Sequence, residues 1–322
     1  MQKKLSVRSL SLACALACVG GSVLAQTYPN KPVRVVVTTV PGPLDAFARA
    51  VLAQMQTNLN QPFVVDNKPG AGGNVGADVV AKAPADGYTL LFALDTTFTV
   101  NPSLYEKMPF DPDRDFSFIG VPVTYSQVLV SGPSMKDTSL TQFVQMAKAK
   151  QLSYASGGNG SPSHLTMAAF LSAAGLNMTH IPYKGTGASV VDVLGGQVDA
   201  LFAVGSGVLP HAKAGKLQAL ASSGTQRSAA TADLPTVAEQ GFPNFNATFA
   251  YVLAAPAGTP PEIVNLLAKE MNLAMKSPKV MELNRVADYT ETQLSQQASA
   301  EWLRHARGHW HGVITTAKIK GD

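Results

Sequence analysis

Short runs of apolar, often β-branched residues alternate with longer segments of helical periodicity along most of the chain. The run Val33–Val40 is almost entirely β-branched, which is typical of a strand buried on both faces. In Leu44–Leu59 apolar residues recur on one stripe, so this segment is predicted to be a helix. The pattern continues with strands expected at Phe63–Val65, Tyr88–Leu94, Val128–Ser131, Leu152–Ala155, His180–Pro182, Ala200–Val204 and Leu217–Ser222, and helices at Gly73–Lys82, Leu140–Lys150, Ser163–Ala174, Ala188–Leu194, from Pro260 or Pro261 to Met275, and at Gln293–Ala317.

This alternation predicts an α/β architecture with mainly parallel sheets and helices on both faces. About 300 of the 322 residues remain after a predicted N-terminal leader, more than one compact core usually serves, so we expect two lobes. Two β-rich segments, Val121–Val130 and Ala247–Ala255, are candidate hinges. Residues 26–125 and 250–322 then form the first lobe, and 126–249 form the second.

Residues 1–25 have the features of a secretory signal peptide. Lys3, Lys4 and Arg8 precede the apolar run Leu10–Val19, and small or apolar residues lead up to Ala25. The run is too short to span a bilayer comfortably, which argues against a retained membrane anchor. A lipoprotein anchored through Cys14 or Cys18 is set aside because both cysteines lie too early. We therefore expect export to the periplasm and cleavage after Ala25.

Cleavage removes three basic residues and both cysteines. The remaining chain is nearly balanced in charge, which argues against nucleic acid as a partner, because phosphate binding needs a concentrated basic surface. An exported chain without cysteine has no disulfides and depends on its core for stability. The apolar-rich, charge-poor composition argues against disorder.

Two polar loops follow predicted strands and open predicted helices. Pro41–Asp45 combines a helix start with glycine and proline, and a helix start offers unpaired backbone N–H groups to an anion. Ala155–His164 adds three hydroxyls, an amide and a run of exposed backbone N–H groups, which suits the binding of an oxyanion. Each also has a simpler interpretation: Asp45 caps an ordinary strand–helix turn, and Ser161 or Ser163 caps a helix. Together the loops place donors on both walls of a cleft, where open α/β sheets bind ligands.

Two further segments lie at predicted strand ends. Asp95-Thr96-Thr97 follows a strand and offers hydroxyls, although a simple turn toward Asn101-Pro102 is an equal alternative. Gly70–Gly76 resembles a nucleotide-binding glycine loop, but Val75 occupies the third glycine position. We interpret it as a flexible turn and not as a cofactor site.

Enzymatic chemistry finds little support in the sequence. No serine lies in a GxSxG elbow, and no cysteine remains after cleavage. The histidine cluster His305, His309 and His311 has no accompanying carboxylate motif and is interpreted as a solvated surface group. His164 and His180 are expected to orient loops and not to transfer protons. We therefore expect no catalytic residues, no metal and no cofactor.

The chain resembles the Bug (Bordetella uptake gene) family, the extracytoplasmic solute receptors of tripartite tricarboxylate transport systems. The resemblance extends over essentially the whole mature chain. It rests on Tyr28–Arg34, Gln61–Gly73, Asp86–Leu91, Asn101–Tyr105, Asp115-Phe116, Tyr154–Ser156, Gly160-Ser161, His164-Leu165, His180–Gly185 and Ala255–Pro260.

This resemblance implies a type II periplasmic-binding-protein fold, with two lobes joined by two crossing β-strands and a ligand cleft between them. It also implies a bound carboxylic acid, held largely by loop backbone groups and ordered waters. The candidate ligand-binding residues are Thr39, Gly42, Pro43, Leu44, Asp45, Thr96, Thr97, Ser156, Gly157, Asn159, Gly160, Ser161, Tyr183 and Ala203.

The chain departs from the family pattern at several positions. Thr38 and Pro41 stand where phenylalanine and glycine are common, and Ala203 stands where aspartate is common. Ala250 replaces a usual tryptophan, and Val252 a usual glycine. These changes predict a less polar, roomier cleft and a bulkier or partly aromatic carboxylate in place of citrate or aspartate.

The expected function is capture of a small organic carboxylate by a monomeric receptor that delivers it to membrane transporter subunits. A periplasmic sensor of the same fold is an alternative that the sequence does not separate from it. An exported enzyme is a second alternative, and it requires a nucleophile or proton-transfer pair across the cleft.

Overall fold

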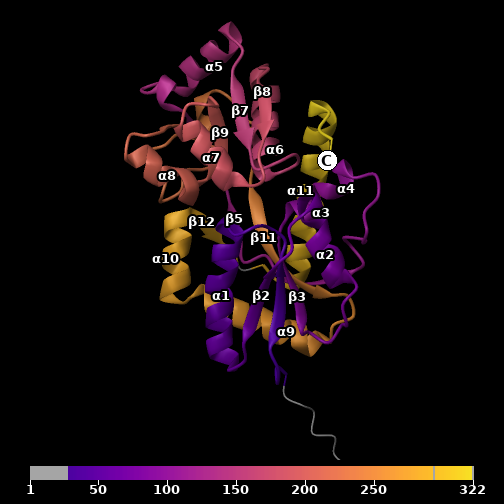
Figure 1. Ribbon diagram of the computed structural model, residues 1–322. Helices are drawn as coiled ribbons and strands as arrows, with labels where there is room; N and C mark the ends of the chain where they lie inside the picture. Colours follow the sequence, from indigo (N-terminus) through magenta and orange to yellow (C-terminus); the bar gives the residue numbers. More distant parts are fainter. Residues whose placement is uncertain (1–27, 293, 321–322) are drawn as a thin grey trace, which may run out of the picture.

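The computed structural model describes residues 28–292 and 294–320. The predicted signal peptide, residues 1–25, lies outside this range. Two β-sheets, each covered by helices, form two lobes, one above the other in Figure 1. No helix within the described ranges is both long enough and apolar enough to cross a membrane.

The first lobe, the lower one in Figure 1, contains a sheet of order β12-β5-β11-β3-β1-β2, with β4 paired to β11. Its strands are β1 (Val33–Val37), β2 (Phe63–Asn67), β3 (Thr89–Leu94), β4 (Phe116–Gly120), β5 (Val123–Tyr125), β11 (Phe249–Pro256) and β12 (Tyr289–Glu291). Its helices are α1 (Pro43–Leu59), α2 (Asn74–Ala81), α3 (Thr96–Thr99), α4 (Asn101–Leu104), α9 (Pro261–Met275), α10 (Pro278–Ala287) and α11 (Gln296–Ala317), with a 3₁₀ turn at Ala71–Gly73.

The second lobe contains a sheet of order β10-β6-β9-β7-β8. Its strands are β6 (Gln127–Ser131), β7 (Ser153–Ser156), β8 (Thr179–Pro182), β9 (Ala200–Val204) and β10 (Gln218–Ser222). Its helices are α5 (Leu140–Ala149), α6 (Pro162–Ala174), α7 (Thr186–Leu194) and α8 (Gly205–Lys213), with 3₁₀ turns at Pro133–Met135 and Ala238–Gln240.

Local sequence signals account for several helix ends. Ser139 caps α5 in a capping box with Gln142, and Ser161 caps α6, whose first residue is Pro162. Gly175 ends α6 in the left-handed conformation at φ 62°, which glycine adopts without steric cost. The fold class and these helices were therefore predictable from the sequence.

Two sequence predictions need correction. Both sheets are mixed: β2-β1-β3 and β8-β7-β9 are parallel, whereas β11, β6 and β10 run antiparallel to their neighbours. The expectation of mainly parallel sheets fails because the chain enters the second sheet through β6 and returns to the first through β11, and both strands run against their neighbours. The strand expected at Val33–Val40 ends at Val37, so Thr38, Thr39 and Val40 belong to the loop that follows.

Two passing segments connect the lobes. β5 pairs with the start of β11, with Tyr125 opposite Phe249 and Thr124 opposite Ala250. The chain continues from β5 directly into β6 of the second lobe, so both predicted hinge segments lie at this crossing. The lobe limits 26–125, 126–249 and 250–322 themselves stay a prediction, although each sheet takes its strands from the corresponding ranges.

Helix α11 packs against α3 and β4 of the first lobe and against α6 of the second (Figure 1). Trp310 on this helix is 1% exposed and stacks on Phe249 at a centroid distance of 4.6 Å. The C-terminal helix therefore rests against the crossing strands as well as against both lobes.

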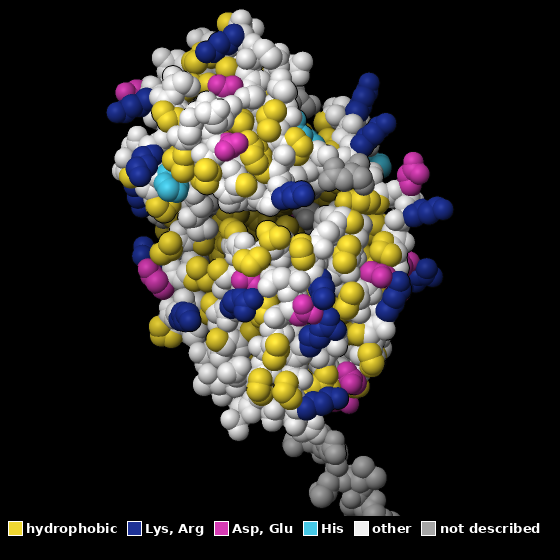
Figure 2. Space-filling view, viewed as in Figure 1, with side chains coloured by type: hydrophobic (Ala, Val, Ile, Leu, Met, Phe, Trp, Pro, Cys, Tyr) yellow, Lys and Arg dark blue, Asp and Glu magenta, His cyan; other side chains and the backbone are white. Residues whose placement is uncertain are grey.

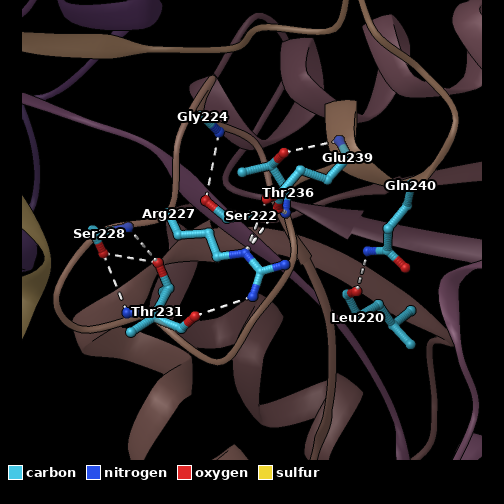
Figure 3. Close-up of polar contacts among 10 residues, drawn as sticks. Leu220, Ser222, Gly224, Arg227, Ser228, Thr231, Thr236, Glu239 and Gln240 are labelled. Carbon is cyan, nitrogen blue, oxygen red and sulfur yellow. Dashed lines mark hydrogen bonds and ion pairs between the residues drawn. The ribbon is translucent and has the colours of Figure 1, made fainter.

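Polar contacts help to hold the segment between β10 and the 3₁₀ turn at Ala238–Gln240 (Figure 3), whose Val237 also packs into the core. Arg227 pairs with Glu239 at 2.9 Å and donates to the carbonyl oxygen of Ala232. The hydroxyls of Ser228 and Thr231 lie 2.8 Å apart. Exposed ion pairs contribute little to stability, so these contacts mainly shape the loop.

Candidate functional site

A cavity of about 420 Å³ lies between the two lobes, and Figure 2 shows the surface hollowed in this region. The first lobe contributes the loops after β1, β2 and β3, and the second lobe contributes those after β7 and β8. The lining residues are Thr38, Thr39, Val40, Pro69, Gly70, Gly72, Gly73, Leu94, Thr96, Gly157, Gly158, Asn159, Gly160, Ser161, Tyr183, Lys184 and Gly185. These loops all follow the carboxyl ends of parallel strands, the usual ligand position in α/β sheets.

Three helices begin at the cavity wall. The residues that precede α2, α6 and α7 are Gly73, Ser161 and Gly185, and all three belong to the lining. The start of a helix carries a partial positive charge and unpaired N–H groups. Helices from both lobes therefore favour negative charge in the same space.

The side chains that line the cavity also favour a negatively charged ligand. Among the described residues that form it, Lys184 alone carries a charge. The hydroxyl oxygens of Thr38 and Thr39 are buried, and neither has a hydrogen-bond partner within the described chain. Buried hydroxyls without partners cost free energy, so their position at a cavity wall favours a ligand that accepts from them.

The loop Gly157–Ser161 differs from the sequence expectation. It was predicted to present free backbone N–H groups to an anion, but four of them already have acceptors inside the loop or next to it. Gly157 donates to Ser163 Oγ at 2.9 Å, Gly158 to Ser156 Oγ at 3.1 Å, Gly160 to His164 Nδ1 at 3.1 Å and Ser161 to the Gly158 oxygen at 3.2 Å.

Half of the predicted site residues line this cavity: Thr39, Thr96, Gly157, Asn159, Gly160, Ser161 and Tyr183. The Tyr183 hydroxyl donates to Asp192 Oδ2 at 2.5 Å, which fixes its ring. The other seven are outside the lining: Gly42, Pro43, Leu44, Asp45, Thr97, Ser156 and Ala203.

The segment Gly42–Asp45 instead starts α1, with Gly42 at the cap position. Asp45 is 6% exposed, and its carboxylate accepts from Arg49 at 2.8 Å and from Asn67 at 2.9 Å. Burial raises the pKa of Asp45, but these hydrogen bonds outweigh burial and leave the pKa below its ordinary value. Its role is therefore to tie α1 to β2.

Ala203, Ala250 and Val252 are fully buried inside their lobes, on β9 and β11. They do not belong to the cavity lining. Small side chains at these three positions therefore do not enlarge this cavity, and of the five departures from the family pattern Thr38 alone belongs to its described lining.

The sequence interpretation missed Thr38, Lys184 and the glycines of Gly70–Gly73. Gly70–Gly73 forms a turn that leads into α2, and this turn also lines the cavity. The feature of the sequence that could have placed this turn at the cavity is its position directly after β2. β2 pairs in parallel with β1, so the two strands end at the same edge of the sheet.

Within residues 28–292 and 294–320, no three His, Cys, Asp or Glu side chains cluster as metal ligands do. His305, His309 and His311 are all exposed on α11.

Comparison with known proteins identifies the family. Residues 47–319 match the model of the tripartite tricarboxylate transporter family receptor. The chain belongs to this receptor family. Protein BugT of Bordetella pertussis is 35% identical over 317 residues, which cover 97% of each chain. The predicted resemblance to the Bug proteins is thereby confirmed.

Solved structures of related receptors share the fold. The structure of R. palustris Rpa4515 with adipate is 29% identical with a TM-score of 0.86, over 91% of this chain and 99% of that one. MatC from Rhodopseudomonas palustris with bound malate is 27% identical with a TM-score of 0.82, over 89% and 100%. This receptor therefore has the two-lobed periplasmic-binding-protein fold expected from the sequence.

Proposed function

We propose that this receptor binds a small organic acid in the cavity between its lobes and passes it to the membrane subunits of a transporter without transforming it. The observation that carries the proposal concerns the hydroxyls of Thr38 and Thr39. Both are buried and lack a partner among the described atoms, at the wall of a cavity whose one charged residue in the described lining is Lys184. An anion with several acceptor atoms satisfies the hydroxyls and meets the positive helix ends.

A dicarboxylate is the ligand class that we favour. Adipate and malate, the acids bound in the related structures, are both dicarboxylates. Two carboxylates suit a cavity with hydroxyl donors on the first lobe and Lys184 and the start of α7 on the second. A volume of about 420 Å³ is in the range of pockets that enclose small molecules. A bulkier or aromatic acid remains the competing sequence-based prediction.

We further propose that the receptor acts in the periplasm as a monomer, after cleavage of residues 1–25. Family membership and the sequence of the leader support export. Native mass spectrometry of freshly purified protein tests stoichiometry and cargo together. We expect the mass of a single chain beginning at Gln26, with or without one small acid.

Scanning fluorimetry over a panel of organic acids tests the ligand class. We expect malate or adipate to raise the midpoint temperature, and neutral analogues such as the corresponding diamides to leave it unchanged. Stabilisation by neutral compounds alone, or turnover of any acid in the panel, contradicts the proposal.

Replacing both threonines, Thr38→Val and Thr39→Val, should weaken binding of the stabilising acid. A hydrogen bond to a charged group contributes about 1.5–3 kcal/mol, so we expect a loss of about tenfold or more for each hydroxyl. Valine has nearly the same shape and removes a buried hydroxyl that has no partner in the free protein, so the ligand-free variant should be at least as stable as the wild type.

Isothermal titration and ligand-free melting curves check this pair of opposite effects. Thr38→Ser with Thr39→Ser is the control, because it keeps both hydroxyls and should retain most of the affinity. Equal affinity of the valine variant and the wild type excludes these hydroxyls from the binding site.

A further inference from the structure

Two histidines lie directly behind the loop Gly157–Ser161. His164 is the third residue of α6 and is 8% exposed, and His180 lies on β8. Neither belongs to the cavity lining. Their rings stack with centroids 3.9 Å apart and planes inclined by 20°. The pair therefore contacts the loop from the side away from the ligand.

Each histidine holds a different part of the loop. His164 Nδ1 accepts the backbone N–H of Gly160 at 3.1 Å. His180 Nε2 lies 2.6 Å from Ser156 Oγ, and this oxygen also accepts the N–H of Gly158 at 3.1 Å. One ring thus acts on the loop directly, and the other acts through a serine.

The bond from Gly160 defines the protonation state of His164. Because Nδ1 accepts, the ring is neutral and carries its proton on Nε2. Burial lowers the pKa of His164 to about 3, and the neighbouring His180 contributes to this effect. The acceptor at Nδ1 is therefore present over the whole physiological pH range.

A loop of this composition needs such support. Gly158 and Gly160 adopt φ values of 124° and 69°, and glycine loses more conformational entropy on ordering than any other residue. The strands supply the platform: Tyr154 on β7 lies opposite His180 on β8, and their rings stack at 4.8 Å. The register of two parallel strands therefore places the aromatic support beneath the loop.

We propose that His164 and His180 are positioning residues for ligand binding. They hold in one shape the loop whose residues Asn159, Gly160 and Ser161 line the cavity. This inference rests on the proposed ligand site, because it holds that the fixed shape of the loop raises the affinity for the ligand. It assigns neither histidine a contact with the ligand.

Variants of His164 separate hydrogen bonding from packing. His164→Asn keeps an acceptor close to the Nδ1 position, whereas His164→Phe keeps the stacked ring and removes the acceptor. In ligand-free protein we expect the Phe variant to shift the Gly160 amide resonance and speed its hydrogen exchange at least tenfold. We expect the Asn variant to stay near the wild type, although it loses the ring.

Titrations with malate and adipate give the second readout. We expect at least tenfold weaker binding for His164→Phe and less than threefold for His164→Asn. The matched pair His180→Phe and His180→Gln should show the same order, because glutamine retains a polar group near Nε2. A purely packing role predicts the reverse order, with phenylalanine the milder change.

The inference is overturned if His164→Phe binds like the wild type or leaves the Gly160 amide unchanged. A ring ¹⁵N spectrum that shows the His164 proton on Nδ1 also overturns it. If neither acid binds the wild type, the proposed ligand class fails. The amide and ring-nitrogen measurements on free protein then still decide whether the histidines hold the loop.

Discussion

Replacing Asp95 by asparagine should stabilise this receptor by about 4 kcal/mol at pH 8, while changing its stability little at pH 4. Asp95 lies between the end of β3 and the start of α3 and is fully buried. Its backbone N–H donates to the carbonyl oxygen of Ala250 on β11. Among the described atoms, neither carboxylate oxygen has a partner at full hydrogen-bonding geometry.

Burial raises the pKa of Asp95 to about 7, although neighbouring backbone groups and Thr99 partly oppose this. A carboxyl pKa raised in the folded state means that the folded protein binds more protons than the unfolded chain between about pH 4 and pH 7. The contribution of the protonated Asp95 carboxyl to the free energy of unfolding is therefore fully present below about pH 4 and is lost as the pH rises to about 7. Each unit of pKa difference corresponds to about 1.4 kcal/mol.

Thermal or urea unfolding of both proteins from pH 4 to pH 8.5 measures this effect. At pH 8 the variant should melt roughly 10 °C above the wild type, and the difference should shrink steadily toward pH 4. Asp233→Asn, at an exposed position in the second lobe, is the control and should change neither curve. A constant difference between the variant and the wild type at all pH values means that Asp95 does not titrate in this range.

The sequence predicted the elements whose burial follows directly from their composition. The strand at Ala200–Val204 was predicted with its observed bounds, because an uninterrupted apolar run of this length fits a central strand. Helix α8 was missed because Gly205, Gly207 and Pro210 weaken helices in isolation. β12 is three residues long and exists through its pairing with β5, so no local pattern indicates it.

The site was predictable as a set of strand ends but not as a set of contacts. The sequence indicated that loops from both lobes meet, and it placed Thr39 in the site, yet it added Gly42–Asp45 and left out Thr38. Which part of a loop faces the cavity depends on where the strand stops, and β1 stops at Val37. The donors of Gly157–Ser161 were misjudged for a similar reason, since Ser163 and His164 occupy them only once α6 has formed.

At Gly160 the two lobes lie in close contact beside the cavity. Its φ of 69° lies in the left-handed region, and a Cβ added there would lie 2.2 Å from Leu104 Cδ1 on α4 of the first lobe. Gly160 itself belongs to the second lobe, between β7 and α6. The absence of a side chain at this position therefore permits the observed spacing of the lobes.

Gly160→Ala should consequently weaken binding of malate or adipate by about 5- to 100-fold. Displacing Leu104 to admit the methyl group costs about 1–3 kcal/mol, and this cost applies only when the lobes are in contact. The left-handed backbone costs alanine about 1–2 kcal/mol more, which lowers stability with or without ligand. Adding Leu104→Ala to Gly160→Ala makes room for the methyl group and should recover part of the affinity. Gly175→Ala is the matched control, because its φ is 62° and no atom lies within 4 Å of its added Cβ.

Isothermal titration of the four proteins, with melting curves beside it, separates backbone strain from closure. We expect Gly175→Ala to lower stability by about the same 1–2 kcal/mol and to bind like the wild type, because its strain lies at the far end of α6. An affinity of Gly160→Ala equal to that of Gly175→Ala, or no recovery on removing the Leu104 side chain, contradicts the idea that ligand binding requires this close contact between the lobes.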